Sequence, residues 1–327
     1  MKGAKVMSKK EILYIVVPCY NEEEALPETS KRLNEKLAEL RSRELISERS
    51  RVVFVDDGSR DKTWESIEKL HAEFPEAFLG VKLSRNRGHQ NALLAGLMYA
   101  KDHADMVISM DADLQDDINA VDGMIEKYYG GADIVYGVRS SRQKDSFFKK
   151  TTAQGFYKTM SFMGAETVYN HADYRLMSRR AIESLSEFGE VNLFLRGIVP
   201  MLGYKTDTVY YERGERLAGE SKYPFRKMLA FAMEGITSFS VKPIRYITLI
   251  GVLIFLISII MIISFIVTWA FGYTVQGWPS LICSIWGIGG LIMISLGVVG
   301  EYVGKIYLEA KHRPSFIIDK VLDDENK

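Results

Sequence analysis

The chain has 327 residues, enough for one large α/β domain with an appended segment. Its 42 Lys and Arg residues balance 42 Asp and Glu residues, and a zero net charge argues against a general nucleic-acid binder, which needs a basic face. Its two cysteines do not have the spacing of a zinc site.

Short apolar runs alternate with helical patterns in the first part of the chain. They predict strands over 12–18, 52–55, 78–83, 106–110 and 134–136, and helices over 22–41, 61–74, 88–103 and 118–129. This alternation is typical of a mostly parallel α/β sheet with helices on both faces, in which ligands bind at the carboxyl ends of the strands. Residues 138–223 are more mixed, and we expect them to complete the domain with helices and edge strands.

The last third of the chain contains two long apolar segments. Residues 245–271 and 278–303 are each long enough to cross a bilayer core of about 30 Å, and basic residues flank the pair on both outer sides. We therefore expect a two-helix transmembrane hairpin in the plasma or inner membrane. The domain over 1–223, the tail over 304–327 and both termini would lie in the cytoplasm. Two buried helices of a soluble protein are the alternative.

Residues 224–240 form an amphipathic pattern directly before the first apolar segment. Apolar residues recur on one side at helical spacing, with a proline at the start. We expect this helix to lie on the membrane surface, and a core helix of the soluble domain is the alternative.

Asp111 and Asp113 follow the predicted strand over 106–110. Two carboxylates one residue apart at a strand end are suited to Mg²⁺ or Mn²⁺, which can neutralise the charge that grows on a departing diphosphate. Acidic pairs also cap helices, and we predict that simpler role for the neighbouring Asp116 and Asp117.

Three other polar clusters stand at predicted strand ends. Asp56 and Asp57 could accept hydrogen bonds from a base or a ribose, or they could form a turn with a helix cap. The segment 18–22 could make a tight turn or a platform for a base, and the segment 84–89 contains basic and amide donors. Because these clusters and the acidic pair share one predicted edge of the sheet, they indicate a ligand site.

Six motifs together carry a family resemblance. They are VPCYNEEEALP (17–27), VDDGSRDKT (55–63), LSRNRGHQNALLAGL (83–97), MDADLQDD (110–117), ADYRLMSRRA (172–181) and ERLAGESKYPFRKM (215–228). As a set they resemble family 2 glycosyltransferases with the GT-A nucleotide-sugar-binding fold, and within that family the bactoprenol glucosyltransferases and dolichyl-phosphate mannose synthases. The resemblance implies an inverting, Mg²⁺- or Mn²⁺-dependent transfer of one hexose or N-acetylhexosamine from a UDP-sugar to polyisoprenyl (undecaprenyl) phosphate, for cell-envelope glycosylation.

The resemblance also implies a set of donor-site residues. Those around the nucleotide sugar are Pro18, Tyr20, Glu22, Asp57, Asp111, Ala112 and Gln115. We add Asp56 and Asn86 because they lie at predicted strand ends. We add Arg216 and Lys222 because their Gly-containing loop could close over the diphosphate. Asp113 is implied as the main metal ligand.

Asp173 matches the position assigned as catalytic base in such enzymes. A phosphate monoester is largely ionised at neutral pH, however, and needs little help from a base. Positioning of the acceptor and a structural pair with Arg175 are therefore alternatives. The residues that we predict to contact the acceptor phosphate are Arg139, Lys149, Lys150, Arg175 and Ser221. Solvated surface side chains are the alternative for Lys149 and Lys150.

Two other functions compete with this interpretation. A processive polysaccharide synthase would carry a Gln-x-x-Arg-Trp motif and more spans, and no Arg-Trp dipeptide occurs here. A non-enzymatic lipid-carrier accessory protein would leave the acidic pair unexplained. The favoured donors are UDP-glucose and UDP-N-acetylglucosamine, the acceptor is a lipid phosphate in the membrane, and no nucleic-acid partner is expected. A homo-oligomer is compatible with the sequence.

Overall fold

The computed structural model describes residues 10–113, 115–140, 171–190, 194–212, 242–271 and 277–323. The chain divides into two compact units, of which one holds the strands, the helices up to α7 and the tail from Pro314, and the other holds α9 and α10. Several predictions lie outside the described residues, namely those for Lys149, Lys150, Arg216, Ser221, Lys222 and the helix over 224–240.

The elements follow the predicted alternation closely. The strands are β1 (Leu13–Cys19), β2 (Arg51–Asp56), β3 (Phe78–Leu83), β4 (Met106–Ser109), β5 (Ile134–Arg139), β6 (His171–Ser178), β7 (Thr206–Tyr211) and β8 (Ile318–Leu322). The helices are α1 (Leu26–Ser42), α2 (Thr63–Glu73), α3 (His89–Lys101), α4 (Ala120–Tyr129), α6 (Arg179–Ser186), α7 (Leu195–Met201), α9 (Lys242–Ala270) and α10 (Trp278–Ala310). Up to β5, the predicted element ends differ from these bounds by at most four residues.

The described strands form one sheet in the order β7-β5-β6-β4-β1-β2-β3-β8. Neighbours among β1, β2, β3 and β4 pair in parallel, whereas β6 runs antiparallel to both β4 and β5. The prediction of a mostly parallel sheet is therefore confirmed. The carboxyl ends of β1 to β5 and the amino end of β6 share one edge of the sheet, and this arrangement positions the candidate site.

Residues 138–223 differ in one respect from the expectation of edge strands. β7 is an edge strand, as expected, but β6 lies inside the sheet between β4 and β5. Neighbouring strands pair with its backbone on both sides. On one side Met106 of β4 pairs with Ser178, and on the other side Val138 of β5 pairs with His171. An internal strand with a polar start, His171-Ala172-Asp173, resembles an edge strand when read from composition alone.

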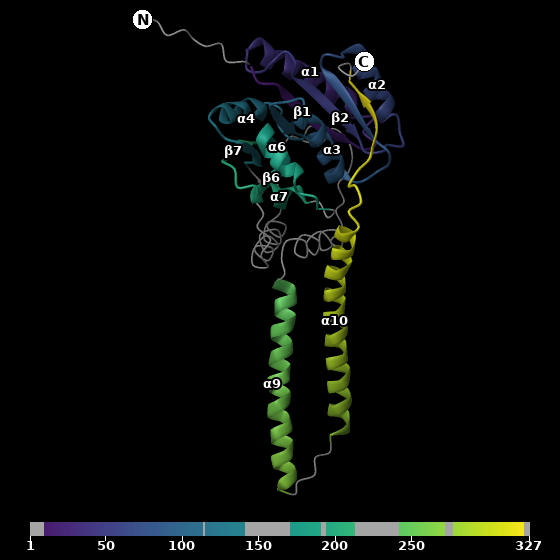
Figure 1. The fold of residues 1–327 in the computed structure, drawn as a ribbon, viewed down its shortest axis with the longest axis vertical. Coiled ribbons are helices and arrows are strands. Elements are labelled where there is room, and N and C mark those ends of the chain that lie inside the picture. Colours follow the sequence, from purple (N-terminus) through teal and green to yellow (C-terminus); the bar gives the residue numbers. More distant parts are fainter. Residues whose placement is uncertain are drawn as a thin grey trace, which may run out of the picture. The chain divides into compact units, whose positions relative to one another are not determined.

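Helices cover both faces of the sheet (Figure 1). Leu13, Ile15 and Val17 of β1 share an apolar core with α1, α2 and α4. On the opposite face α3 packs against β1 and β2. A Cβ atom at Gly96 would lie 2.4 Å from Cγ1 of Val16, so the glycine lets α3 approach the sheet closely. Burial on both faces explains why β1 is apolar throughout.

The tail after α10 returns to the sheet, which the sequence did not predict. α10 continues past the expected end at 303 to Ala310, and β8 then pairs antiparallel with β3 at the edge of the sheet (Figure 1, yellow). A segment expected to be only a cytoplasmic tail thus contributes a strand to the sheet of the first unit.

The second unit contains the apolar helices. Within the part of the chain that the structure describes, Gly287–Ala310 is long and apolar enough to cross a membrane, with a mean hydropathy of 1.5 and none of its most apolar window buried. α9 contains the shorter apolar stretch Ile244–Ile254. Large apolar side chains that are more than half exposed include Leu249, Leu253, Ile260, Ile294 and Leu296.

Candidate functional site

The turns after β1 and β2 are bonded to each other at the shared edge of the sheet. The backbone N–H of Asn21 donates to Ser59 Oγ (3.0 Å), and the N–H of Arg60 donates to Asn21 Oδ1 (2.9 Å). Glu22 N–H donates to Oγ1 of Thr63 at 2.8 Å. Beside these bonds Tyr20 is exposed, so its ring is available to a base, whereas Pro18 is buried inside β1.

Asp57 holds the loop that follows β3. Its Oδ1 accepts from the N–H of Arg87 (2.6 Å), and its Oδ2 accepts from the N–H of Gly88 (2.8 Å). Burial raises the pKa of Asp57, and the two N–H groups oppose that shift. Asp56 is fully buried and accepts from Ser59 N–H at 3.1 Å, so it shapes its own turn. Direct contact of Asp56, Asp57 or Asn86 with a nucleotide remains a prediction.

Gly58 is required where this turn meets the loop. Its φ is +66°, and a Cβ atom there would lie 2.5 Å from the backbone nitrogen of Asn86. Neither the conformation nor the space admits a side chain without movement. Two of the predicted strand-end clusters are therefore packed backbone against backbone.

The acidic pair lies directly after β4. Asp113 Oδ1 accepts from the N–H of Gln115 at 3.2 Å, and Thr29 of α1 donates to the carbonyl of Ala112 at 2.7 Å. Ala112 and Gln115 are buried. These contacts hold the turn that presents Asp111 and Asp113 at the edge of the sheet.

The pKa of Asp111 is raised by burial and by the charges of neighbouring carboxylates. Removal from water raises its pKa to about 6. His89, whose Nε2 lies 3.5 Å from Asp111 Oδ1, opposes the shift, and the charges of Asp116, Asp173 and Asp113 add to it. The carboxylates of Asp111 and Asp113 are oxygen ligands of the kind that hard divalent cations prefer, so the donor set fits Mg²⁺ or Mn²⁺.

The part of the chain that the structure describes brings few ligands together for such a cation. Among the described residues, no three His, Cys, Asp or Glu side chains converge as a metal site would require. Asp111 and Asp113 alone would leave coordination positions open, and Mg²⁺ commonly fills such positions with oxygens of substrate phosphates.

Asp173 stands at the amino end of β6, next to the acidic pair. Arg175 Nη2 donates to its Oδ1 at 2.7 Å, and Arg196 of α7 donates to both oxygens at 3.2 and 3.1 Å. Gln90 adds a bond to Oδ2 at 3.1 Å. Burial alone would raise the pKa of Asp173, but the two guanidinium groups outweigh it and hold the pKa well below the usual range.

Arg175 does not fit its predicted contact with a lipid phosphate. Its side chain is only 2% exposed, and it donates to Asp173 and to the carbonyl of Leu195. The alternative of a structural Asp–Arg pair describes Asp173 and Arg175 better, because a buried guanidinium needs a buried carboxylate partner.

The predicted capping role of Asp116 is wrong. Its carboxylate is buried and accepts from Tyr211 (2.6 Å) and from Arg139 Nη2 (3.3 Å). Only Asp117 serves the local turn, where it accepts from the N–H of Asn119, the residue before α4. Arg139 is at the end of β5, as expected. Its contact with the acceptor phosphate remains a prediction.

Three further described residues lie around Asp173, of which only His89, the last residue of the segment 84–89, belongs to a predicted strand-end cluster. They are His89 and Gln90 in the first turn of α3, and Arg196 in α7. His89 Nε2 lies 3.7 Å from Asp173 Oδ2 as well as near Asp111. The available signal for Arg196 was a lone arginine in the apolar stretch FLRGIVPM.

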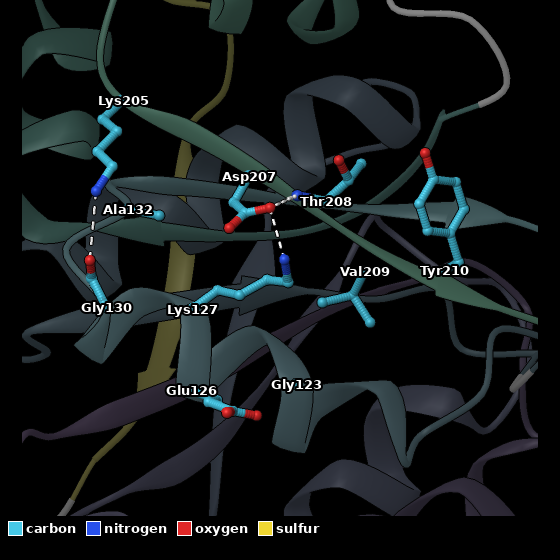
Figure 2. A pocket seen from close by; sticks show the side chains of 10 residues that line it. All are labelled: Gly123, Glu126, Lys127, Gly130, Ala132, Lys205, Asp207, Thr208, Val209 and Tyr210. Carbon is cyan, nitrogen blue, oxygen red and sulfur yellow. Dashed lines mark hydrogen bonds and ion pairs between the residues drawn. The ribbon is translucent and has the colours of Figure 1, made fainter.

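A hollow elsewhere on the domain does not coincide with this site. It measures about 620 Å³ and lies between α4 and β7. Figure 2 shows that its lysines already have partners: Lys127 is bonded to Asp207 (2.6 Å) and Lys205 to the carbonyl of Gly130 (3.3 Å). With both lysines already bonded and no predicted site residue in its lining, this hollow offers little to a nucleotide.

Comparison with known proteins agrees with the resemblance noted in the motifs. The model for "Glycosyl transferase family 2" matches residues 14–186. The glycosyltransferase YkoT of Bacillus subtilis (strain 168) is 52% identical over 96% of this chain and 93% of its own. The bactoprenol glucosyl transferase of Shigella phage SfV is 43% identical over 93% of this chain and 97% of its own, and the prophage homolog of Escherichia coli (strain K12) is 42% identical over 94% and 98%.

Among solved structures, mannosyl-3-phosphoglycerate synthase from Rubrobacter xylanophilus gives a TM-score of 0.47 at 15% identity, over 68% of this chain and 71% of that one. The family match covers β1 to α6, which includes Tyr20, Asp57, the acidic pair and Asp173. The sheet is that of the expected GT-A-like fold, and the chain belongs to glycosyl transferase family 2.

Proposed function

We propose that this enzyme transfers one hexose or N-acetylhexosamine from a UDP-sugar to a polyisoprenyl phosphate such as undecaprenyl phosphate. The observation that carries the proposal is the identity of 42–43% with bactoprenol glucosyl transferases over more than nine tenths of the chain. Glucose and N-acetylglucosamine are the favoured sugars. The product would be a lipid-linked sugar for glycosylation of the cell envelope.

The reaction would be a single displacement. An oxygen of the lipid phosphate attacks the anomeric carbon, the bond from that carbon to the UDP oxygen breaks, and the configuration inverts. The acceptor is largely ionised at neutral pH, since the second pKa of a phosphate monoester is about 6. A carboxylate held by Arg175 and Arg196 is a poor proton acceptor, so we assign Asp173 to orienting Arg196 beside the acidic pair.

The cofactor would be Mg²⁺ or Mn²⁺ held by Asp111 and Asp113. When bound, such an ion offsets the charge that develops on the departing diphosphate. Tyr20 would stack on the base, and Asp57 would keep the loop over 84–88 against the nucleotide. Arg139 is the described candidate for the acceptor phosphate, at the same edge of the sheet.

We further propose that α9 and α10 anchor the enzyme as a membrane hairpin. β8 belongs to the same sheet as β1, so the chain before α9 and the chain after α10 share one compartment. The two helices then cross a bilayer together or not at all. Exposed apolar side chains along both helices support crossing, because water would disfavour such a surface. Basic residues at the outer ends of the two helices, among them Lys242, Arg245, Lys311 and Arg313, support a cytoplasmic domain.

The test is a donor panel with the full chain in membranes that contain undecaprenyl phosphate. UDP-glucose, UDP-N-acetylglucosamine, UDP-galactose and GDP-mannose are supplied separately, and the lipid product is identified by mass. We expect a gain of one sugar with one UDP-sugar. A ladder of masses would indicate a processive synthase instead. Absence of any sugar–lipid with all four donors would overturn the proposal.

A further inference from the structure

The C-terminal tail, defined here as Pro314–Asp323, is built into the edge of the sheet next to the donor site. β8 pairs with β3 from Gly80 with Leu322 to Leu83 with Ile318. A Cβ atom at position 80 would lie 2.9 Å from Leu322 Cδ1, so Leu322 occupies the space that a side chain there would need. This close packing shows that the tail is a fitted part of the domain.

The far end of the tail is anchored by a buried charge. The Asp323 side chain is 2% exposed, accepts a hydrogen bond from the Tyr99 hydroxyl and lies 3.5 Å from Arg51 Nη1. A carboxylate at such a position is costly to bury without partners, and Tyr99 of α3 and Arg51 of β2 serve as such partners. The anchor therefore specifies the register of β8 on the sheet.

The near end of the tail is bonded to the loop after β3. The N–H of Ser84 donates to the carbonyl of Ile317 at 2.9 Å, and Arg87 Nη2 donates to the carbonyl of Pro314 at 2.8 Å. These bonds join residues more than two hundred positions apart in the sequence. These two hydrogen bonds attach the loop over 84–88 to the tail.

The same loop is also hydrogen-bonded to Asp57. The N–H groups of Arg87 and Gly88 donate to the two oxygens of Asp57, and Gly58 packs against the backbone of Asn86. Arg87 thus bonds the tail through its side chain and the donor-site carboxylate through its backbone. A continuous set of contacts runs from Asp323 through β8 and the loop to Asp57.

We propose that the tail is a positioning element of the donor site, with Arg87 and Asp323 as its positioning residues. By holding the loop over 84–88 in one conformation before the nucleotide arrives, the tail removes an ordering cost from donor binding. The inference rests on the proposed function, since it takes Asp57 and this loop as part of the nucleotide site. The tail follows α10 after three residues, so it joins the proposed membrane anchor to the donor site along the chain.

The experiment uses the full chain in detergent, with UDP binding measured by calorimetry and sugar transfer measured at saturating donor. Asp323→Ala removes the anchor at a distance from the nucleotide, and Asp323→Asn is a milder variant that keeps its shape. We expect Asp323→Ala to raise the Kd for UDP about tenfold, the scale of losing one charge-assisted hydrogen bond. We expect turnover at saturating donor to stay within about twofold, because the acidic pair is untouched.

The matched control is Lys320→Ala. Lys320 belongs to the same strand and is bonded to Glu68 at 2.7 Å, but it makes no described contact with the loop. We expect this variant to leave the Kd for UDP unchanged. Arg87→Ala should resemble Asp323→Ala, and the double variant should be less damaging than the two single effects combined, because both act through one linkage.

Amide hydrogen exchange supplies a readout that does not depend on activity. In Asp323→Ala the amides of Ser84, Arg87 and Gly88 should exchange faster, and in Lys320→Ala they should not. Faster exchange in the loop with an unchanged Kd for UDP would overturn the inference. Failure of the unmodified chain to bind UDP would instead contradict the proposed function, while the effect of the tail on exchange would still be measured.

Discussion

Arg196 donates hydrogen bonds to both carboxylate oxygens of Asp173, with Nε 3.2 Å from Oδ1 and Nη2 3.1 Å from Oδ2. Arg175 approaches Oδ1 from within β6 at 2.7 Å. One buried carboxylate therefore balances two guanidinium groups, of which only that of Arg196 is partly exposed. This geometry favours a charged, immobile Asp173 over one that exchanges a proton during the reaction.

Replacement of Asp173 by Asn should lower stability at pH 7 by about 3 kcal/mol, because it leaves Arg175 buried without a counter-charge. The folded pKa of Asp173 lies below its unfolded value of about 3.9, so its stabilisation is fully present above pH 3.9 and is lost as pH falls through the folded pKa. The difference in unfolding free energy between the Asp173→Asn variant and the parent should therefore become smaller below about pH 4. Thermal unfolding across pH measures this difference, with the partly exposed Asp117→Asn as control, and a difference that widens in acid would refute the pairing.

Replacement of Asp113 by Ala should reduce sugar transfer at least about a hundredfold, the scale of removing one strong electrostatic stabiliser. Asp117→Ala is the matched control, since Asp117 lies four residues away and its carboxylate accepts hydrogen bonds from Asn119, in the turn before α4. EDTA should abolish transfer by the parent, and Mg²⁺ or Mn²⁺ should restore it. Full activity in excess chelator, measured as labelled sugar–lipid, would exclude the metal assignment.

Replacement of Gly58 by Ala should weaken UDP binding and lower the unfolding temperature. The new Cβ would need a positive φ, which costs an L-residue about 1–2 kcal/mol, and it would press on the backbone of Asn86. Gly189→Ala is the control, because its Cβ would meet nothing within 4 Å and its φ is not positive. If both glycine variants bind UDP equally well, the close approach of turn and loop does not shape the donor site.

The hairpin topology predicts opposite accessibility for the connection between α9 and α10 and for the tail. Cysteine placed at Thr274 should react with an impermeant maleimide in intact cells, in a chain whose Cys19 and Cys283 are replaced by Ala. Lys320→Cys, on the exposed side of β8, should react only after permeabilisation. Labelling at both positions from outside would contradict a hairpin with a cytoplasmic domain.

Much of the fold could be predicted because its signals are local. Burial on both faces makes β1 apolar throughout and makes residues 52–55 of β2 apolar, and polar residues such as Asn21 and Asp56 mark where each run ends. The same local logic predicted that Asp57 and Asp111 follow strands. Since parallel strands end at a common edge, their meeting there required no knowledge of strand order.

The direction and order of strands were decided only in the tertiary structure. β6 runs against β4, and this reversal sets Asp173 beside Asp111 although it starts a strand instead of ending one. Arg196, Tyr211 and the tail reach the site or its neighbourhood by hydrogen bonds between segments far apart in the chain. Such pairings leave no periodic pattern, so Asp116 looked like a helix cap and β8 like a tail. The sequence by itself determined which segments form strands and which chemistry stands at their ends, whereas long-range pairing decided which of those groups meet.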